Sequence, residues 1–253
     1  MLIGAATMAR NMASLIGATV KSLSWVDGIY LYDDGSEDNT AEVAVANSSA
    51  SICVEKSTEE FCAFERGEAN VRNHVIDRAF ESLGCDILVI VDADELLSSE
   101  IIPCIEKIWR EDQWNSIAVS TWHLYDCKSY LHFWETTWNN DYMIDPHVRI
   151  IKQGIYFEQF HKDGSHPGIM PTEKTLCLHG PYHFHLKYFS KSPYPNYALD
   201  FLPRRLTPEA VAPYRRPLPF SLHKNILDAI NSIGWDNLEE TDTPYYSIYQ
   251  RNK

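Results

Sequence analysis

Two aspartates separated by one residue follow the most apolar run of the chain. Residues 87–91 read Ile-Leu-Val-Ile-Val, and Asp92 and Asp94 come directly after them. Such a run is typical of a strand buried on both faces of a parallel sheet. Ligands bind outside the carboxyl ends of strands in open α/β sheets. Carboxylates at that place suit a hard divalent cation that also holds a diphosphate.

A second acidic segment, residues 33–40, reads Asp-Asp-Gly-Ser-Glu-Asp-Asn-Thr and also follows an expected strand. The carboxylates of Asp33 and Asp34 can accept hydrogen bonds from a base N–H or a ribose hydroxyl. Gly35 permits a tight turn, and Asp38 can cap the helix that follows. A polar turn before a capped helix explains the segment equally well.

The third feature is Arg72, in the first turn of a helix expected over residues 69–80. A cation at the positively polarised start of a helix is unfavourable unless an anion shares the site. A nucleotide phosphate or a base carbonyl would fill that role. The alternative is a solvated surface arginine.

The elements that must position these residues alternate between strand and helix. Apolar runs predict strands at 2–6, 28–32, 52–54 and 87–91, and apolar periodicity predicts helices at 12–23, 40–46, 69–80 and 99–110. In the last helix we expect Ile101, Ile105, Ile108 and Trp109 to face inward. Repeated strand–helix units predict an α/β fold with a mostly parallel sheet, right-handed crossovers and flanking helices.

The character of the chain changes after about residue 115. We expect a nucleotide-binding α/β half over 1–115 and an aromatic-rich half of the same domain over 116–192, with strands near 117–121 and 147–151. A proline-rich extension over 193–253 should contain a short helix at 221–234.

Bulk properties exclude some classes of protein. The net charge of −13 argues against a nucleic-acid binder that works by neutralising phosphates. The six cysteines are scattered without a Cys-x-x-Cys pair, which favours reduced thiols and a cytoplasmic location. No signal peptide or transmembrane segment is expected.

Taken in order, three motifs resemble the GT-A-fold glycosyltransferases of family 2. They are Asp-Asp-Gly-Ser-x-Asp-Asn-Thr at 33–40, Ala-Asn-x-Arg-Asn at 69–73 and Ile-Val-Asp-Ala-Asp-Glu at 90–95, and Thr-Met-Ala-Arg-Asn at 7–11 looks like that family's opening segment. The resemblance covers roughly residues 2–110. It implies a GT-A (Rossmann-like) fold and metal-dependent transfer of a sugar from a nucleoside diphosphate to an acceptor hydroxyl, with inversion.

The resemblance also implies roles for individual residues. Ala6, Asp33, Asp34 and Arg72 would lie at the nucleotide, together with Asp92. Asp92 and Asp94 would hold Mn²⁺ or Mg²⁺. The expected donor is a UDP-sugar first and a GDP- or dTDP-sugar next, and the acceptor is a glycan, a lipid-linked molecule or a small molecule.

The sequence offers two candidates for the general base. The better-known members carry a Glu-Asp pair on the acceptor side, but none occurs after residue 112. Glu158 and Asp163 are the nearest candidates to deprotonate an acceptor hydroxyl, although each is also explained as an ordinary loop carboxylate.

A histidine cluster occupies residues 179–185. In an extended segment, His183 and His185 would share one face. Imidazole is a good ligand for Mn²⁺, and GT-A enzymes often recruit a C-terminal histidine, so both are candidate metal ligands. Stacking or hydrogen bonding in an aromatic wall is the alternative. An acceptor platform, or simply core packing, is expected of the aromatic residues Trp122, His123, Tyr125, Trp134 and Trp138, and His161 and His166 are candidates to line the acceptor pocket.

Two other functions stay open. A sugar nucleotidyltransferase has a related fold, but residues 4–10 match its glycine-rich loop poorly. A non-catalytic nucleotide-sugar-binding protein would explain the missing Glu-Asp pair.

Overall fold

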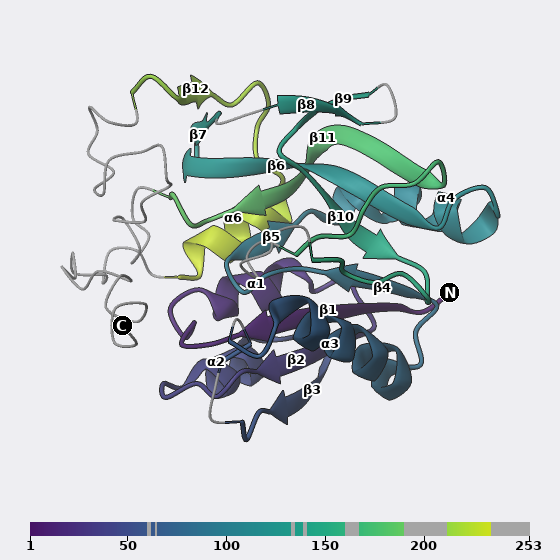
Figure 1. Ribbon diagram of the computed structural model, residues 1–253. Coiled ribbons are helices and arrows are strands. Elements are labelled where there is room, and N and C mark those ends of the chain that lie inside the picture. Colours follow the sequence, from purple (N-terminus) through teal and green to yellow (C-terminus); the bar gives the residue numbers. More distant parts are fainter. Residues whose placement is uncertain are drawn as a thin grey trace.

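Four parallel strands form the part of the sheet that the sequence predicts most directly. The computed structural model describes residues 1–59, 62–63, 65–132, 135–138, 141–159, 167–189 and 212–233. Strand β1 (Ile3–Ala9) lies between β2 (Gly28–Asp33) and β4 (Ile87–Ile90), and β3 (Ser51–Lys56) lies outside β2 (Figure 1). The carboxyl ends of these strands therefore lie along one edge, where the acidic segments begin.

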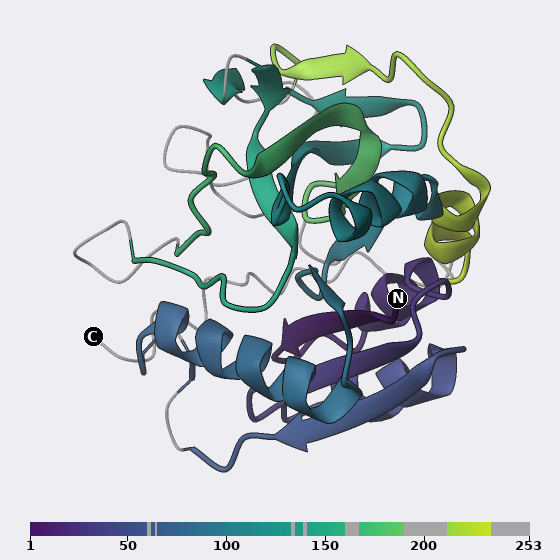
Figure 2. The same cartoon turned by 90° about the vertical axis from the view of Figure 1, so that its right-hand side faces the viewer.

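Two hydrophobic cores lie on opposite faces of this sheet. Side chains alternate between faces along each strand, so Ala5 joins one core and Ala6 joins the other. The first core includes residues of α1 (Ile16–Ser22) and α2 (Thr40–Asn47), and the second is covered by α3 (Glu68–Leu83) (Figure 2). The sheet is thus flanked by helices, as the sequence predicts.

The second half of the chain extends the same sheet. Strand β10 (Pro146–Ile151) pairs antiparallel with both β4 and β6 (Ser116–Asp126), which confirms the strands expected near 147–151 and 117–121. Strand β11 (Thr175–His185) pairs parallel with β6 and antiparallel with the short β5 (Glu95–Leu97). Side chains from β6, β10 and β11 consequently meet the turn that follows β4.

The outer elements are small. Strand β7 (Ser129–Leu131) pairs with β6 and with β12 (Arg215–Pro217), while β8 (Glu135–Trp138) and β9 (Asp141–Ile144) form a separate two-stranded sheet. Helix α6 (Lys224–Asn231) falls where a short helix was expected, and Asn225 Nδ2 donates to the Ser22 and Leu97 carbonyls, both at 3.3 Å.

The expectation that Trp109 faces inward is wrong. A short 3₁₀ turn (Ser99–Ile101) precedes α4 (Ile102–Arg110), and Ile101, Ile105 and Ile108 are fully buried. Trp109 is 44% exposed. The three isoleucines recur every three or four residues and share one face, whereas Trp109 is turned about 100° away from Ile108.

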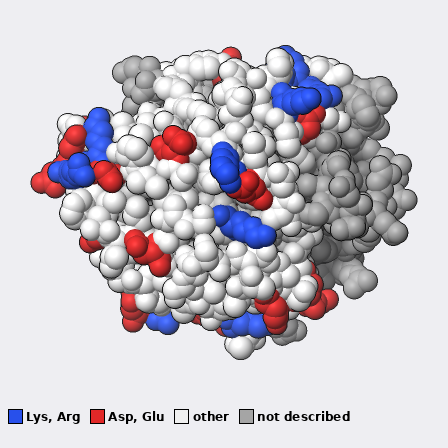
Figure 3. All heavy atoms as spheres, turned by 180° about the vertical axis from the view of Figure 1, so that it is seen from behind, with Lys and Arg blue, Asp and Glu red and all other residues white. Residues whose placement is uncertain are grey.

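The surface and the cysteines add three observations. All six cysteines are free thiols. On the rear face, lysine and arginine side chains lie beside acidic ones over a mostly uncharged surface (Figure 3). Within the described residues, every helix is too short or too polar to cross a membrane.

The burial difference within α4 gives a test of the fold. Ile108→Ala should lower the free energy of unfolding by about 2–4 kcal/mol, because it leaves a cavity in the core. Trp109→Ala on the same turn should cost clearly less, because much of the indole is already in water. Urea denaturation of both variants measures the difference, and equal losses would contradict the orientation of α4.

Candidate functional site

The segment after β2 is bonded to the segment after β1. Ser36 Oγ accepts from the Asn11 N–H at 3.0 Å, and Asn11 Oδ1 accepts from the Glu37 N–H at 2.8 Å. Asp33 is buried and accepts from the Ser36 N–H at 2.8 Å. Gly35 has a φ of 74°, which only glycine adopts without steric cost. Asp33 therefore shapes this turn, and its contact with a nucleotide stays a prediction.

Both carboxylate oxygens of Asp34 have partners within the fold. Its Oδ2 accepts from the Ala63 N–H at 2.7 Å, and its Oδ1 is paired with the Arg66 guanidinium. Arg10 Nη1 donates to the Asp34 carbonyl at 2.9 Å. A base or ribose would have to share this carboxylate with the chain between β3 and α3.

Ala6 lies in the interior of β1, because this strand continues to Ala9 rather than ending near residue 6. A small recess at the end of β4 is lined by Ala6, Met8, Arg72, Val75, Ile76, Ile90, Val91 and Phe157. Its lining is apolar apart from the Arg72 guanidinium.

Arg72 is neither a free anion receptor nor a solvated surface residue. Its Nε donates to Glu68 at 2.8 Å and its Nη1 donates to Asp92 at 2.7 Å, while its guanidinium lies 5.2 Å from the centre of the Phe157 ring. Burial lowers the pKa of Arg72, but Asp92 and Glu68 raise it above its ordinary value. Arg72 therefore stays charged and fixes Asp92.

The neighbouring residue Asn73 ties the second half of the chain to the same helix. Its Nδ2 donates to the Phe157 carbonyl at 3.0 Å, and its Oδ1 accepts from the Phe157 N–H at 2.7 Å. Glu158, which follows Phe157 in the chain, is exposed, and its backbone pairs with Gly168. Asp163, His161 and His166 lie outside the described residues, as does Trp134.

Glu95 holds the turn formed by residues 92–95, which we call the acidic turn. The Glu95 N–H donates to the Asp92 carbonyl at 3.0 Å, and Glu95 Oε2 accepts from the Asp92 N–H at 2.9 Å. Glu95 is 2% exposed and is paired with Arg149 on β10. Arg149 Nη2 also lies 3.2 Å from Asp92 Oδ2.

These cations keep both acids of the turn ionised. Burial raises the pKa of Asp92 and Glu95, but Arg72 beside Asp92 and Arg149 beside Glu95 outweigh it and lower both pKa values. A buried charge is tolerated only when it is paired. Asp92 is thus held between two guanidinium groups, and its side chain is 28% exposed at the end of β4.

His183 belongs to the same buried group. It is fully buried, with Nε2 3.0 Å from Glu95 Oε2 and Nδ1 3.0 Å from Thr121 Oγ1. Burial lowers the pKa of His183. The structure directs this imidazole to Glu95 rather than to Asp94, so we leave His183 out of the candidate metal site.

Asp94 and His185 are the two predicted ligands that do meet. His185 Nε2 lies 3.1 Å from Asp94 Oδ2, and the Leu186 N–H donates to the Asp94 carbonyl at 2.8 Å. Their side chains are 18% and 16% exposed. Burial lowers the pKa of His185, but Asp94 raises it above the ordinary value.

This pair fits a divalent cation. Adjacent ligands of an octahedral ion at about 2.1 Å are roughly 3 Å apart, close to the observed spacing. Within the described residues, no three His, Cys, Asp or Glu side chains are grouped to hold a metal. Asp94 and His185 would therefore supply two ligands, and diphosphate oxygens would supply others.

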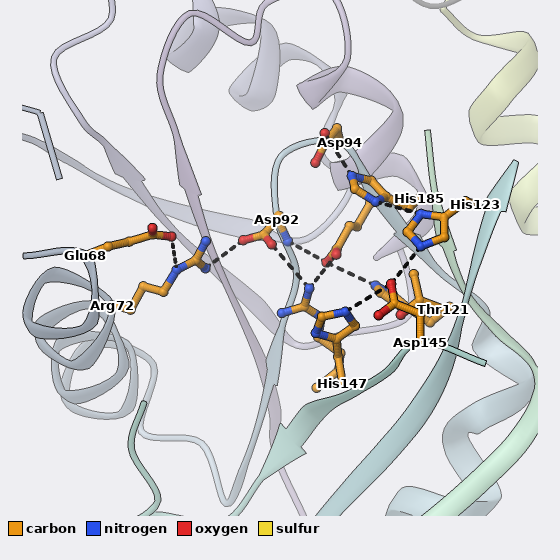
Figure 4. A network of polar contacts seen from close by, with 12 residues as sticks. Glu68, Arg72, Asp92, Asp94, Thr121, His123, Asp145, His147 and His185 are labelled. Carbon is orange, nitrogen blue, oxygen red and sulfur yellow. Dashed lines mark hydrogen bonds and ion pairs between the residues drawn. The ribbon is translucent and has the colours of Figure 1, made fainter. Parts of the chain in front are cut away.

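A second imidazole lies behind His185. The Nδ1 atoms of His185 and His123 are 3.1 Å apart, and His123 Nε2 lies 2.7 Å from Asp145 Oδ2 (Figure 4). His147 Nε2 approaches the same Asp145 oxygen at 3.4 Å. Burial lowers the pKa of His123 to about 4, so its ring is neutral at pH 7. Burial raises the pKa of Asp145, but His147 and His123 lower it well below its usual range.

The sequence interpretation missed Glu95, Arg149, Asp145 and His147 as site residues, and it assigned His123 only to an aromatic platform. A signal existed for three of them. Glu95 directly follows the Asp-x-Asp pair, and His147 and Arg149 are polar residues at alternate positions of an apolar strand. Asp145 has a φ of 37°, which no sequence pattern indicates.

Comparisons with known proteins identify the fold. No protein-family model and no curated protein matches the sequence. The structure of S. aureus TarS 1–349 in complex with UDP matches with a TM-score of 0.50 and 13% identity, covering 73% of this chain and 60% of that one. The chain thus has the GT-A fold and spans 60% of the TarS fragment.

Two further structures are similar. Another structure of S. aureus TarS 1–349 gives a TM-score of 0.49 at 14% identity, over 73% of this chain and 60% of that one. Glucosyl-3-phosphoglycerate synthase from Mycobacterium tuberculosis, in complex with Mn²⁺, UDP-Glc and phosphoglyceric acid, gives 0.34 at 19% identity. That match covers 49% of this chain and 44% of the other and is too weak to add to the fold assignment.

The pairing of the acidic turn predicts a large effect of Arg149. Arg149→Met should lower the free energy of unfolding by about 3–5 kcal/mol, because it leaves Glu95 charged and buried without its cation. Arg110→Met removes an exposed pair with Glu106 at 3.1 Å and should cost less than about 1 kcal/mol. Chemical denaturation compares the two, and similar losses would show that Arg149 is not needed to hold the turn.

Proposed function

We propose that the chain is a glycosyltransferase that moves a sugar from a nucleoside-diphosphate sugar to an acceptor hydroxyl, with the help of Mn²⁺ or Mg²⁺. The observation that carries this proposal is the contact between Asp94 and His185 at the end of β4. It joins a carboxylate and an imidazole at the edge of a GT-A sheet, where a nucleotide is expected. The similar TarS structure was solved with UDP.

The nucleotide side of the site would be formed by α3 and the ends of β1, β2 and β4. The recess beside Ala6 and Phe157 offers an apolar wall for a base, and Arg72 adds a permanent cation at its rim. Asp33 and Asp34 shape the loop next to it and remain the proposed contacts to base and ribose. UDP is the first choice of nucleotide, and GDP and dTDP follow.

Asp94 and His185 would hold the cation against the diphosphate, and Asp92 would lie beside them. The chemistry that a bound divalent cation supplies there is neutralisation of charge on the departing nucleoside diphosphate. Arg72 and Arg149 keep Asp92 ionised and fixed. In this arrangement Asp92 contributes by position and charge, whereas Asp94 is the carboxylate that turns toward an imidazole.

Glu158 and Asp163 are the proposed bases for the acceptor hydroxyl. The described part of the segment supports Glu158, because Asn73 fixes the preceding residue, Phe157, against α3 and close to Arg72. A carboxylate that takes the proton from the attacking hydroxyl would give direct displacement and inversion.

Glu158→Gln and Asp163→Asn should distinguish the two candidate bases. Replacement of the true base should lower the rate of sugar transfer by about 10²-fold or more, while nucleotide affinity is kept.

Replacement of Asp94 tests the cation site. Asp94→Asn should abolish the gain in UDP affinity that Mn²⁺ gives to the wild type, because the amide is a weaker and uncharged ligand. Asp228→Asn, which alters an exposed i,i+4 pair on α6, is the matched control and should behave like the wild type. Calorimetric titration with UDP, with and without Mn²⁺, measures both. Equal affinities of Asp94→Asn and wild type would count against the assignment.

The products of turnover distinguish the proposed enzyme from its rivals. Release of nucleoside diphosphate from a sugar nucleotide, lost in Asp94→Asn, is the expected result. Release of pyrophosphate from a nucleoside triphosphate and a sugar phosphate would instead identify a nucleotidyltransferase. Tight nucleotide binding without transfer or hydrolysis of any sugar nucleotide would identify a binding protein.

A further inference from the structure

We infer that His123 and Asp145 are positioning residues that set the proton arrangement of His185, so that its Nε2 faces Asp94 as a cation ligand. The inference deepens the proposed function, because the cation belongs to that function. The arrangement of protons itself is a property of this chain and can be measured without a metal.

The positions of the ring nitrogens carry the argument. His185 presents Nε2 to Asp94 at 3.1 Å and Nδ1 to His123 Nδ1 at 3.1 Å. A histidine that binds a cation through Nε2 carries its proton on Nδ1, and that N–H is normally fixed by an acceptor. Here the acceptor is the Nδ1 lone pair of His123.

His123 can accept at Nδ1 only if its own proton is on Nε2. Asp145 provides the reason for this tautomer, because its Oδ2 lies 2.7 Å from His123 Nε2. An ionised carboxylate only accepts hydrogen bonds, so Nε2 of His123 must be the donor. His185 therefore donates a hydrogen bond to His123, and His123 donates one to Asp145.

The same arrangement serves both forms of His185. Without a cation, a protonated His185 donates from Nε2 to Asp94 and from Nδ1 to His123. When Nε2 loses its proton, Nδ1–H is already in place and the bare Nε2 faces Asp94. A cation taken up at Nε2 would therefore leave the Nδ1–H bond from His185 to His123 in place.

The surroundings hold the two rings at these angles. Their centroids are 5.2 Å apart, and the Tyr188 ring lies edge-on to His123 at 5.4 Å and to His185 at 6.0 Å. Asp145 has a left-handed backbone, with a φ of 37°. Positive φ is uncommon for a residue with a side chain and persists where the surrounding structure enforces it. Here it accompanies a carboxylate aimed at His123.

The first measurement reads the protons directly. In ¹⁵N NMR spectra of the metal-free wild-type chain, His185 should carry a proton on Nδ1, and His123 should carry one on Nε2 with a bare Nδ1. In Asp145→Asn, the amide can donate to His123 Nε2 as well as accept from it, so part of the His123 proton should move to Nδ1. In Asp145→Ala, which has no acceptor at this place, the fixed Nδ1–H of His185 should be lost. A wild-type His123 with its proton on Nδ1 would overturn the inference.

The second measurement is Mn²⁺ affinity at saturating UDP, from the electron paramagnetic resonance signal of free Mn²⁺. Asp145→Ala and His123→Phe should weaken binding by about 10–100-fold, the usual cost of losing a partner behind a metal-bound histidine. His123→Gln keeps an acceptor oxygen and should recover most of the affinity. His132→Gln, at a histidine paired with Glu135 at 3.0 Å, is the control and should match the wild type.

The two measurements fail in different ways. A wild-type chain that binds no Mn²⁺ in the presence of UDP would refute the cation site of the proposed function, while the NMR spectra would still decide the proton arrangement. An Asp145→Ala chain with wild-type ¹⁵N spectra and wild-type Mn²⁺ affinity would refute the role of Asp145 and His123. Recovery by His123→Gln but not by His123→Phe separates positioning from packing.

Discussion

The structure depends on the compensation of charge in the acidic turn. Asp92 and Glu95 are brought to the end of a buried strand, where an unpaired carboxylate would be strongly destabilising. Arg72 reaches Asp92 from α3, and Arg149 reaches both Asp92 and Glu95 from β10. The turn can therefore form only when helix and strand from both halves of the chain are in place, which couples assembly of the site to completion of the fold.

The second half extends the first sheet instead of forming a separate layer, and this arrangement supplies partners to the acidic turn. Strand β10 lies antiparallel beside β4 and delivers Arg149, and β11 lies parallel to β6 and brings His183 and His185 beside Thr121 and His123. Two kinds of polar group result on one face of the sheet. In the first group, Arg149 neutralises Glu95. In the second group, the imidazoles of His185 and His123 connect Asp94 to Asp145.

Much of the first half could be predicted from the sequence, because buried parallel strands are continuous apolar runs and the helices between them are periodic. The meeting of Asp94 with His185 was also anticipated, although ligation by them stays a prediction. Local patterns could not reveal the pairing of β11 with β5 and β6, since it joins residues about 60–90 positions apart. They also could not show that Asp33, Asp34 and His183 have partners within the fold, or that Asp145 adopts a left-handed conformation.

The hydrogen bonds of the Asn73 side chain couple any movement of α3 to the backbone of Phe157. Asn73 binds both the N–H and the carbonyl of Phe157, and the residue before it on α3, Arg72, lines the recess at the end of β4. A tilt of α3 on occupation of the recess would therefore displace Phe157 and the adjacent residue Glu158. The recess and the backbone next to Glu158 lie on the same face of the sheet, so occupancy of the first would be felt at the second without any change in the sheet itself.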